Sequence, residues 1–434
     1  MSKKKPSTVR HTRAIERDRT KRLTTAPPDE KIEQHLKELV HPATYAQLAT
    51  YHAMGLRERT LSLPVMVALV LSLIWRQMGS VAEAVRVLQN EGFLWTSTLK
   101  VSQQAVSERL RTLPAELFER IFEAVLPQLD ARHRARTRPL PAAVTHARMH
   151  FTAVLALDGS TLDALMRKVG LLKDQEQVPL AGRMAALLDI GSMLPHQVWY
   201  ESDSQAHDQR FWQRVLAALE PGVLLVFDLG FVNYPIFDQL TRQGVFFITR
   251  LKTNAAYQVE QVLEAGASIR DQFIVLGSTP CAHVMRLVEV HYKGTWYRYL
   301  TNVLDTQVLS AAQVAALYRQ RWRLEDAFNL VKRLLGLAYF FGGAQNAVAL
   351  QVWATWLLYS VLVDLTDAVA EALAMRYGAV SVEMVYRGLY HFTQAYHRGE
   401  ATDPVAYLAA HAKELGLIKQ KRRRKKDLTK SSPP

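Results

Sequence analysis

Residues 318–332 read YRQRWRLEDAFNLVK, and this stretch decides how the rest of the chain is interpreted. At about 100° of rotation per residue, a helix would place Tyr318, Arg321, Glu325 and Lys332 within a stripe roughly 60° wide. Beside that stripe lies an apolar arc of about 120°, formed by Leu317, Leu324, Ala327, Phe328, Val331, Leu334 and Leu335. The segment is therefore predicted to pack on a core and to hold a carboxylate, two cations and a phenol at its edge. Arg323, Asp326 and Arg333 are predicted to point the other way.

The predicted helix has recognisable ends. Ser310 is a suitable N-cap, and Gln313 stands three residues later, which is the capping-box pattern. Gly336 follows Leu335 and supplies a C-terminal stop. No glycine or proline lies between these ends, so one continuous helix is expected.

Two further acids follow apolar runs that read as buried strands. Phe151–Leu157 (FTAVLAL) ends at Asp158, and Val223–Phe227 (VLLVF) ends at Asp228. Sites in α/β sheets gather at the carboxyl ends of strands, so Asp158, Asp228 and Glu325 form a candidate three-carboxylate constellation. Hard divalent ions are held by a few carboxylates, and two such ions can promote phosphodiester displacement. Taken singly, each acid is equally compatible with a turn or a solvated helix face.

The pattern along the chain indicates several regions. Residues 25–131 are predicted to form an all-α N-terminal, DNA-binding domain, and residues 132–150 read as a linker. The α/β core is assigned to residues 150–252, with a helix at 207–219, and resumes at 307–345. A β-strand insertion at 253–306 separates the two parts, and a helical region covers 346–417. A helix-turn-helix from residues 81–89 and 102–112 is disfavoured, because the connection is too long for that motif.

Charge is concentrated at both ends of the chain. Nine Lys or Arg residues face two acids in residues 1–24, and eight face one acid in residues 418–434, while the whole chain of 434 residues carries +14. Both segments are expected to be disordered basic arms that bind a polyanion, with nucleic acid favoured over a mere solubility role. The single cysteine, Cys281, excludes a disulfide framework and fits a reducing compartment. The start of the chain lacks an apolar signal segment, and the apolar runs at 61–78 and 347–370 read as buried helices.

The motifs together resemble a known family. The LALDGST and FDLGF segments and the Tyr-Arg-Glu-Lys spacing are similar to DDE transposases of the insertion-sequence branch that carries this YREK signature. The resemblance covers about residues 151–336. It implies an RNase H-like α/β core, a mixed sheet flanked by helices, with a β-strand insertion between the second and third catalytic acids, and it also suits helical N- and C-terminal regions.

The resemblance implies roles for individual residues. Asp158, Asp228 and Glu325 would be catalytic and would bind two Mg²⁺ or Mn²⁺ ions. Tyr318, Arg321 and Lys332 would grip phosphates of the transposon end. Weaker candidates for DNA contact are Arg250 and Lys252 in FITRLK, and Trp296 and Tyr297 in the insertion, where a flipped base could stack. Ordinary strand aromatics remain the alternative at Trp296 and Tyr297.

The resulting expectation is a transposase that binds double-stranded DNA at terminal inverted repeats and at a target. It would cleave the ends, through hairpins, and join the 3′-hydroxyls to target DNA as a homodimer in a synaptic complex. A cytoplasmic, nucleoid-associated location is expected. The alternatives are a DNA-binding protein without transposition activity and an RNase H-like nuclease that cuts without joining.

Overall fold

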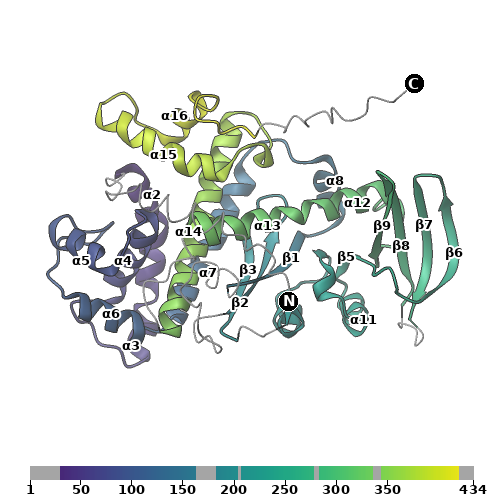
Figure 1. The fold of residues 1–434 in the computed structure, drawn as a ribbon, viewed down its shortest axis with the longest axis horizontal. Coiled ribbons are helices and arrows are strands. Elements are labelled where there is room, and N and C mark those ends of the chain that lie inside the picture. Colours follow the sequence, from purple (N-terminus) through teal and green to yellow (C-terminus); the bar gives the residue numbers. More distant parts are fainter. Residues whose placement is uncertain (1–29, 163–181, 204–206, 278–282, 336–343, 420–434) are drawn as a thin grey trace, which may run out of the picture.

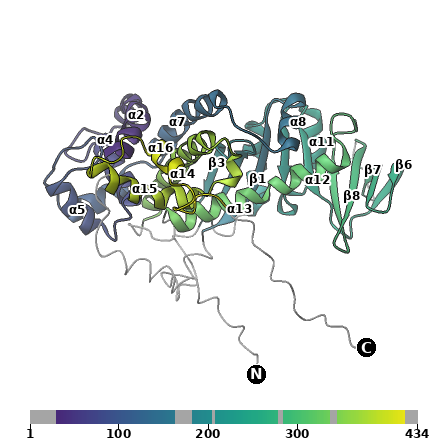
Figure 2. The ribbon, with the colours of Figure 1, turned by 90° about the horizontal axis from the view of Figure 1, so that it is seen from above.

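A computed structural model describes residues 30–162, 182–203, 207–277, 283–335 and 344–419. The two basic arms, Cys281 and Gly336 therefore lie outside the described residues, except for residues 418 and 419 of the second arm. The molecule is elongated, with a helical body at one end and a β extension at the other (Figures 1 and 2).

The N-terminal part is helical, as predicted. Its helices are α2 (Glu30–Ala46), α3 (Leu48–Ala53), α4 (Leu63–Trp75), α5 (Val81–Asn90), α6 (Gln103–Thr112) and α7 (Glu116–Ala135). The predicted linker is wrong in part, because α7 continues to Ala135 and α8 (Ala142–His150) is a helix that packs on the first strand. Val144 and Ala147 of α8 are fully buried, and their burial stabilises a helix that the basic, proline-containing sequence did not suggest.

Among the described residues, one mixed nine-stranded sheet follows the N-terminal helices, in the order β3-β2-β1-β4-β5-β9-β8-β7-β6. The strands are β1 (Val154–Thr161), β2 (Arg183–Asp189), β3 (Pro195–Glu201), β4 (Leu224–Phe227), β5 (Phe246–Arg250), β6 (Tyr257–Ala265), β7 (Ile269–Leu276), β8 (Met285–Tyr292) and β9 (Thr295–Thr301). Strands β1, β4 and β5 are parallel, and the other neighbouring pairs are antiparallel. The mixed α/β class is confirmed.

The β-rich segment at 253–306 extends this sheet instead of forming a separate one, because β9 pairs with β5. Strand β6 was not expected from the sequence. It is an edge strand with Val259 and Val262 about half exposed, so it lacks the apolar alternation that marks a half-buried strand.

Helices cover the two faces of the sheet differently. On one face, α8, α12 (Ala311–Gln320), α13 (Trp322–Asn329) and α14 (Gln345–Ala372) share a core with the N-terminal helices. On the other face, η1 (Asp208–Phe211), α10 (Trp212–Ala217), η2 (Leu229–Phe231) and α11 (Tyr234–Arg242) enclose a second core. The helix predicted at 207–219 is thus a 3₁₀ turn followed by a shorter α-helix.

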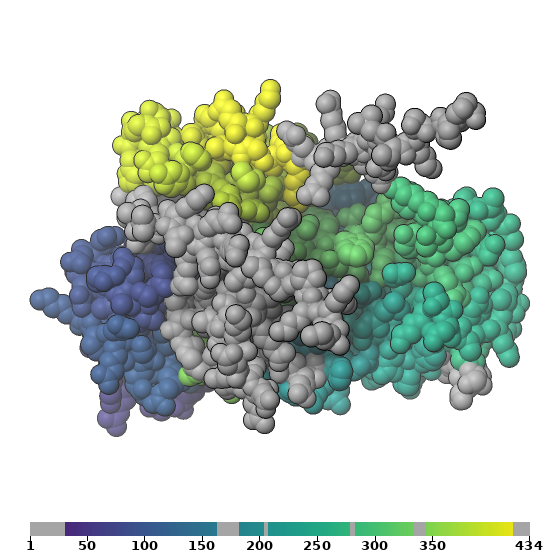
Figure 3. Space-filling view, in the orientation of Figure 1, coloured from purple at the N-terminus to yellow at the C-terminus, as the bar shows by residue number. Residues whose placement is uncertain are grey.

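The C-terminal region is helical, as expected. It comprises α14, the 3₁₀ turn η4 (Tyr377–Ala379), α15 (Val382–His397) and α16 (Pro404–Ala410). Figure 3 shows the end of the described chain, in yellow, at the upper left, away from the sheet extension at the right.

Helix α14 is long and apolar enough to cross a membrane, yet 94% of its apolar window is buried inside the protein. Its two buried acids are paired with α7 and the segment after it. Arg136 Nη1 lies 2.7 Å from Asp364 Oδ1, and His133 Nδ1 lies 3.0 Å from Asp367 Oδ2. These ion pairs and the packing on α7, α4 and α16 indicate a core helix.

Candidate active site

Asp158 and Asp228 occupy neighbouring positions on one face of the sheet. The parallel pairing sets Leu157 beside Phe227, so the next residue along each of these two segments is an acid. Val154 and Ala156 of β1, and Leu224 and Val226 of β4, belong to the core under α12–α14. Because strand side chains alternate between faces, Asp158 and Asp228 point to that same side.

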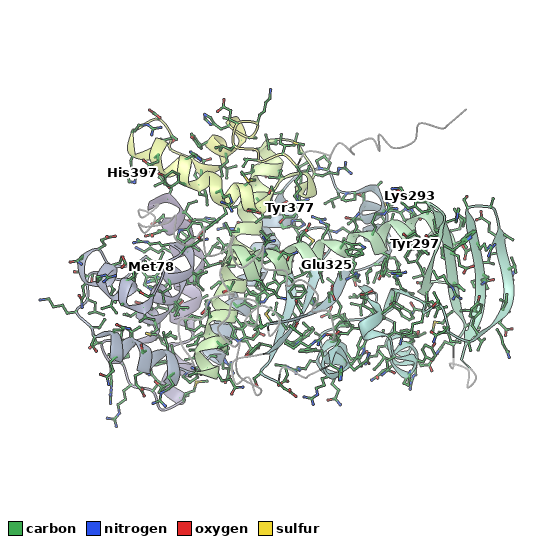
Figure 4. The ribbon with its side chains drawn as sticks, viewed as in Figure 1. Met78, Lys293, Tyr297, Glu325, Tyr377 and His397 are labelled. Atoms are coloured by element: carbon green, nitrogen blue, oxygen red, sulfur yellow. The ribbon has the colours of Figure 1, made fainter. Side chains whose placement is uncertain are left out.

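Glu325 reaches these acids from α13, at the centre of the molecule between the helical body and the extension (Figure 4). The capping box of Ser310 and Gln313 starts α12, as predicted. The prediction of one continuous helix is wrong, because α12 ends at Gln320 and α13 starts at Trp322. At this break the Arg321 N–H bonds to Tyr318 O at 3.1 Å, three residues back, which tightens the turn. Residues Leu330–Leu334 then form a π-helical turn that carries Lys332.

The Arg321 guanidinium lies among the three acids. Its Nη1 donates to Asp158 Oδ2 at 2.7 Å, and its Nη2 lies 3.8 Å from Asp228 Oδ2 and 3.7 Å from Glu325 Oε1. The Arg321 side chain is only 4% exposed, whereas those of Asp228 and Glu325 are 39% and 46% exposed. One buried cation therefore offsets part of the negative charge of an acidic cluster that opens towards solvent.

The pKa of the Asp158 carboxyl is raised to about 6. Burial is the largest cause, Arg321 and the Gly159 N–H oppose the rise, and the nearby charges of Asp228 and Glu325 add to it. Burial lowers the pKa of Arg321, but Asp158, Tyr318 and Asp228 more than offset it, so the net shift is upward. A carboxyl with a raised pKa beside like charges is typical of a functional site.

Tyr318 and Lys332 also contact the acid-bearing strands. Tyr318 Oη donates to Asp228 Oδ1 at 2.8 Å, and burial raises the pKa of this phenol well above its usual range. Lys332 Nζ contacts Ser160 Oγ and donates to Thr161 O at 3.0 Å. The four residues of the predicted stripe thus all face the ends of β1 and β4. Arg323, predicted to point away, is instead half-buried, because it donates to Ile190 O at 3.0 Å and packs on Tyr377.

The remaining predicted residues lie on β5, on β9 and just beyond β5. Arg250 ends β5 on the same face as Asp158, since Ile248 belongs to the core of that face, and its guanidinium lies 5.8 Å from the Tyr297 ring. Lys252 is exposed just beyond β5. Trp296 precedes Tyr297 and so points to the opposite face, where Arg270 stacks on it at 4.3 Å. The structure brings Tyr297, but not Trp296, to the side of the acids.

Two residues at the site were missed from the sequence. Tyr299 contacts the Tyr318 ring at 5.2 Å, and alternation from Tyr297 could have suggested it. Asp208 lies beneath the acid-bearing strand and is paired with Arg183, whose Nη2 is 2.6 Å from Asp208 Oδ1. The only sequence signal for Asp208 is a glycine shortly after each of the two aspartates, Asp158 and Asp228.

The donor set suits a hard divalent cation, because all three acids offer carboxylate oxygens and each lies within 4 Å of a single cationic group. Among the described side chains, however, no group of three or more His, Cys, Asp or Glu residues is gathered closely enough to hold a metal ion as it stands. The guanidinium of Arg321 fills the place between the acids. The residues fit such an ion in chemistry.

Comparison with known proteins gives consistent matches. Residues 151–361 match the family model described as a transposase DDE domain. A putative transposase of Sinorhizobium fredii is 25% identical over 277 residues, which cover 61% of this chain and 72% of that protein. A probable transposase for insertion sequence element IS5377 of Geobacillus stearothermophilus is 29% identical over 152 residues, or 33% of this chain and 40% of that protein.

The match to a solved structure has a lower sequence identity than these two matches. A piggyBac transposase synaptic complex with hairpin DNA aligns with a TM-score of 0.41 and 10% identity, covering 95% of this chain and 90% of that chain.

Proposed function

Because this chain belongs to the DDE transposases of insertion sequences, we propose that it binds the terminal inverted repeats of its element, cleaves the ends and joins their 3′-hydroxyls to target DNA. The observation that carries this proposal is the convergence of Asp158, Asp228 and Glu325 on one buried guanidinium. The strand order β3-β2-β1-β4-β5 supports the RNase H-like core expected from the sequence.

The three acids would hold two Mg²⁺ or Mn²⁺ ions, which when bound would activate the attacking oxygen and stabilise the leaving one. Arg321 would then move from the acids and neutralise a phosphate of the cleaved strand, since guanidinium groups match phosphate in geometry and charge. Tyr318 orients Asp228 through the hydrogen bond at 2.8 Å. Cleavage through hairpin ends and assembly as a homodimer on two ends belong to the same proposal.

Other side chains would position the DNA. Lys332 is held at the end of β1 by Thr161 O and would meet the strand being cut. Arg250 and Lys252 would bind phosphates further along the same face. Tyr297 would offer a stacking surface on that face, whereas Trp296 would contact DNA only on the reverse side of the extension. The basic arms would add sequence-independent attraction.

A strand-transfer assay tests the proposal. Purified protein is incubated with Mg²⁺ or Mn²⁺, a target plasmid, and either intact or pre-cut terminal DNA taken from the sequences that flank the gene. Cleaved and joined products are expected for the wild type. Glu325→Ala should abolish both products while retaining end binding in a gel-shift assay.

Asp326→Ala is the matched control, because Asp326 is the exposed neighbour of Glu325 on the same helix. Cleavage without joining of the pre-cut end would favour the nuclease alternative. Equal cleavage by the Glu325→Ala and Asp326→Ala variants would refute the assignment of the third acid.

A further inference from the structure

Asp208 lies against both of the segments that carry Asp158 and Asp228. A Cβ added to Gly159, the residue after Asp158, would overlap Asp208 Oδ1. A Cβ added to Gly230, two residues after Asp228, would lie 2.8 Å from Asp208 Oδ2. Real Cβ atoms essentially never approach another atom so closely. Because glycine has no Cβ, one oxygen of the Asp208 carboxylate can lie against the backbone of each glycine.

Asp208 occupies the face of the sheet opposite Glu325. Along β1, Asp158 and Ser160 face Arg321 and Lys332, so Gly159 and Thr161 face the other way. The residue paired with Thr161 is Arg183, and its Nε donates to Asp208 Oδ1 at 2.7 Å. The Asp208 carboxylate is therefore held by Arg183 on the face of β1 opposite the Asp158 side chain, and it acts on Asp158 through the backbone.

The same short segment also holds the Asp228 loop. Gln209 Nε2 donates to Gly230 O at 2.8 Å, and Trp212 Nε1 donates to Phe231 O at 3.0 Å. The Asp208 side chain is 17% exposed, and Trp212 is buried in the core of that face. Residues 208–212 thus connect the loop after β4 to the end of β1.

We propose that Asp208 is a positioning residue that fixes the separation of Asp158 and Asp228 by lying against the segments that follow both acids. This inference rests on the proposed function, because it assigns Asp208 to the same two acids. Its carboxylate fills a fixed space and accepts from Arg183, so its shape and its acceptor oxygen matter more than its charge. A ligand of the ions would instead need the charge and would face Arg321.

The test compares Asp208→Ala, Asp208→Asn and Gly159→Ala with the wild type. Asparagine keeps the size of the side chain and an oxygen that can accept from Arg183, whereas alanine removes both. Gly159→Ala pushes the carboxylate away while leaving Asp208 in place. Asp203→Asn is the matched control, because Asp203 is a partly exposed acid five residues earlier whose Oδ2 lies 2.6 Å from Arg210 Nη1.

Three quantities are measured: Mn²⁺ affinity by titration calorimetry without DNA, and kcat and KM for cleavage of the end. Asp208→Ala and Gly159→Ala should each weaken Mn²⁺ affinity and lower kcat by about 10- to 100-fold, as is usual for groups that orient metal ligands. KM for the DNA should stay within about twofold of the wild type, because no proposed DNA contact has been removed. Asp208→Asn and Asp203→Asn should remain within a few-fold of the wild type in all three.

Two results would overturn the inference. Wild-type Mn²⁺ affinity and kcat in both Gly159→Ala and Asp208→Ala would show that the contact is irrelevant. A loss of Mn²⁺ binding in Asp208→Asn as severe as in Asp158→Asn would make Asp208 a ligand instead. If Asp208→Ala does not fold, Gly159→Ala and Asp208→Asn still decide the question. A wild-type protein that binds Mn²⁺ but cuts no ends would refute the proposed function alone.

Discussion

Arg321 and Asp158 form a buried ion pair, with Nη1 and Oδ2 separated by 2.7 Å, at the centre of the acidic cluster. The guanidinium is nearly inaccessible to solvent, and its Nε has no hydrogen-bond partner among the described residues. A buried polar group left unpaired is costly, so the contacts to the acids must hold Arg321 in this position. In the metal-free protein, Arg321 supplies the positive charge that the cluster requires.

Arg321→Gln should therefore destabilise the metal-free protein, because it leaves three neighbouring carboxylates without their cation. Breaking a buried pair in this way costs about 3–5 kcal/mol. Urea unfolding at neutral pH measures the loss, and Mg²⁺ should restore more stability to the variant than to the wild type. Arg333→Gln, at an exposed position of the following turn, serves as the control. Equal stability of the two variants would contradict the role given to Arg321.

Tyr318→Phe removes the hydrogen bond to Asp228 and leaves the ring packed on Tyr299. A hydrogen bond to a charged group contributes about 1.5–3 kcal/mol, so cleavage should slow by roughly tenfold or more, while gel-shift affinity for the end changes little. Tyr386→Phe is the control, because its Oη donates to Trp75 O, far along the chain from the acids. Cleavage by Tyr318→Phe at the wild-type rate would refute an orienting role.

The stability of the metal-free protein should depend on the protonation of Asp158. Its pKa is raised from 3.8 to about 6, so the folded state binds this proton more tightly than the unfolded chain does. Protonated Asp158 therefore adds to the free energy of unfolding below about pH 4, and this added stability is lost as pH rises to about 6. The total change in unfolding free energy is about 3 kcal/mol. Asp158→Asn lacks this titration, so its unfolding free energy should rise relative to the wild type across that window. Parallel urea-unfolding profiles of the two proteins would contradict the prediction.

Arg286 ties the sheet extension to the segment that precedes α12. It is fully buried, its Nη2 lies 2.6 Å from Asp271 Oδ2, and its Nη1 donates to Leu309 O at 2.6 Å. Arg286→Met should cost about 3–5 kcal/mol of unfolding free energy, because it strands the Asp271 charge.

The double variant Arg286→Met with Asp271→Leu should recover part of that loss, since no unpaired charge remains. Urea unfolding of the single and double variants measures both effects. A double variant less stable than Arg286→Met alone would show that the stranded charge is not the cause.

Local sequence rules predicted much of the site. Ser310 and Gln313 form the expected capping box, and both apolar runs form buried strands. Strand β4 ends just before Asp228 as predicted. The predicted end of the other strand at Asp158 is wrong, because pairing with β2 continues β1 to Thr161. These features depend on neighbouring residues and on periodicity, which a single sequence contains. Three expectations were wrong. The continuous helix breaks at Arg321, the linker at 132–150 contains α8, and β6 forms by pairing along β7. Packing and strand pairing override the local pattern at these positions.

By itself, the sequence determined that Tyr318, Arg321, Glu325 and Lys332 share one side of a helical segment, and that an aspartate follows each of two apolar runs that form buried strands, because both results follow from backbone periodicity. Only the tertiary structure decided that Arg321 lies among the three acids and that Asp208 backs the two loops. The reason is physical: the pairing of β1 with β4 and the choice of sheet face set distances between residues that are not neighbours in the sequence, such as Tyr318 and Asp228, 90 positions apart, and no local propensity encodes them.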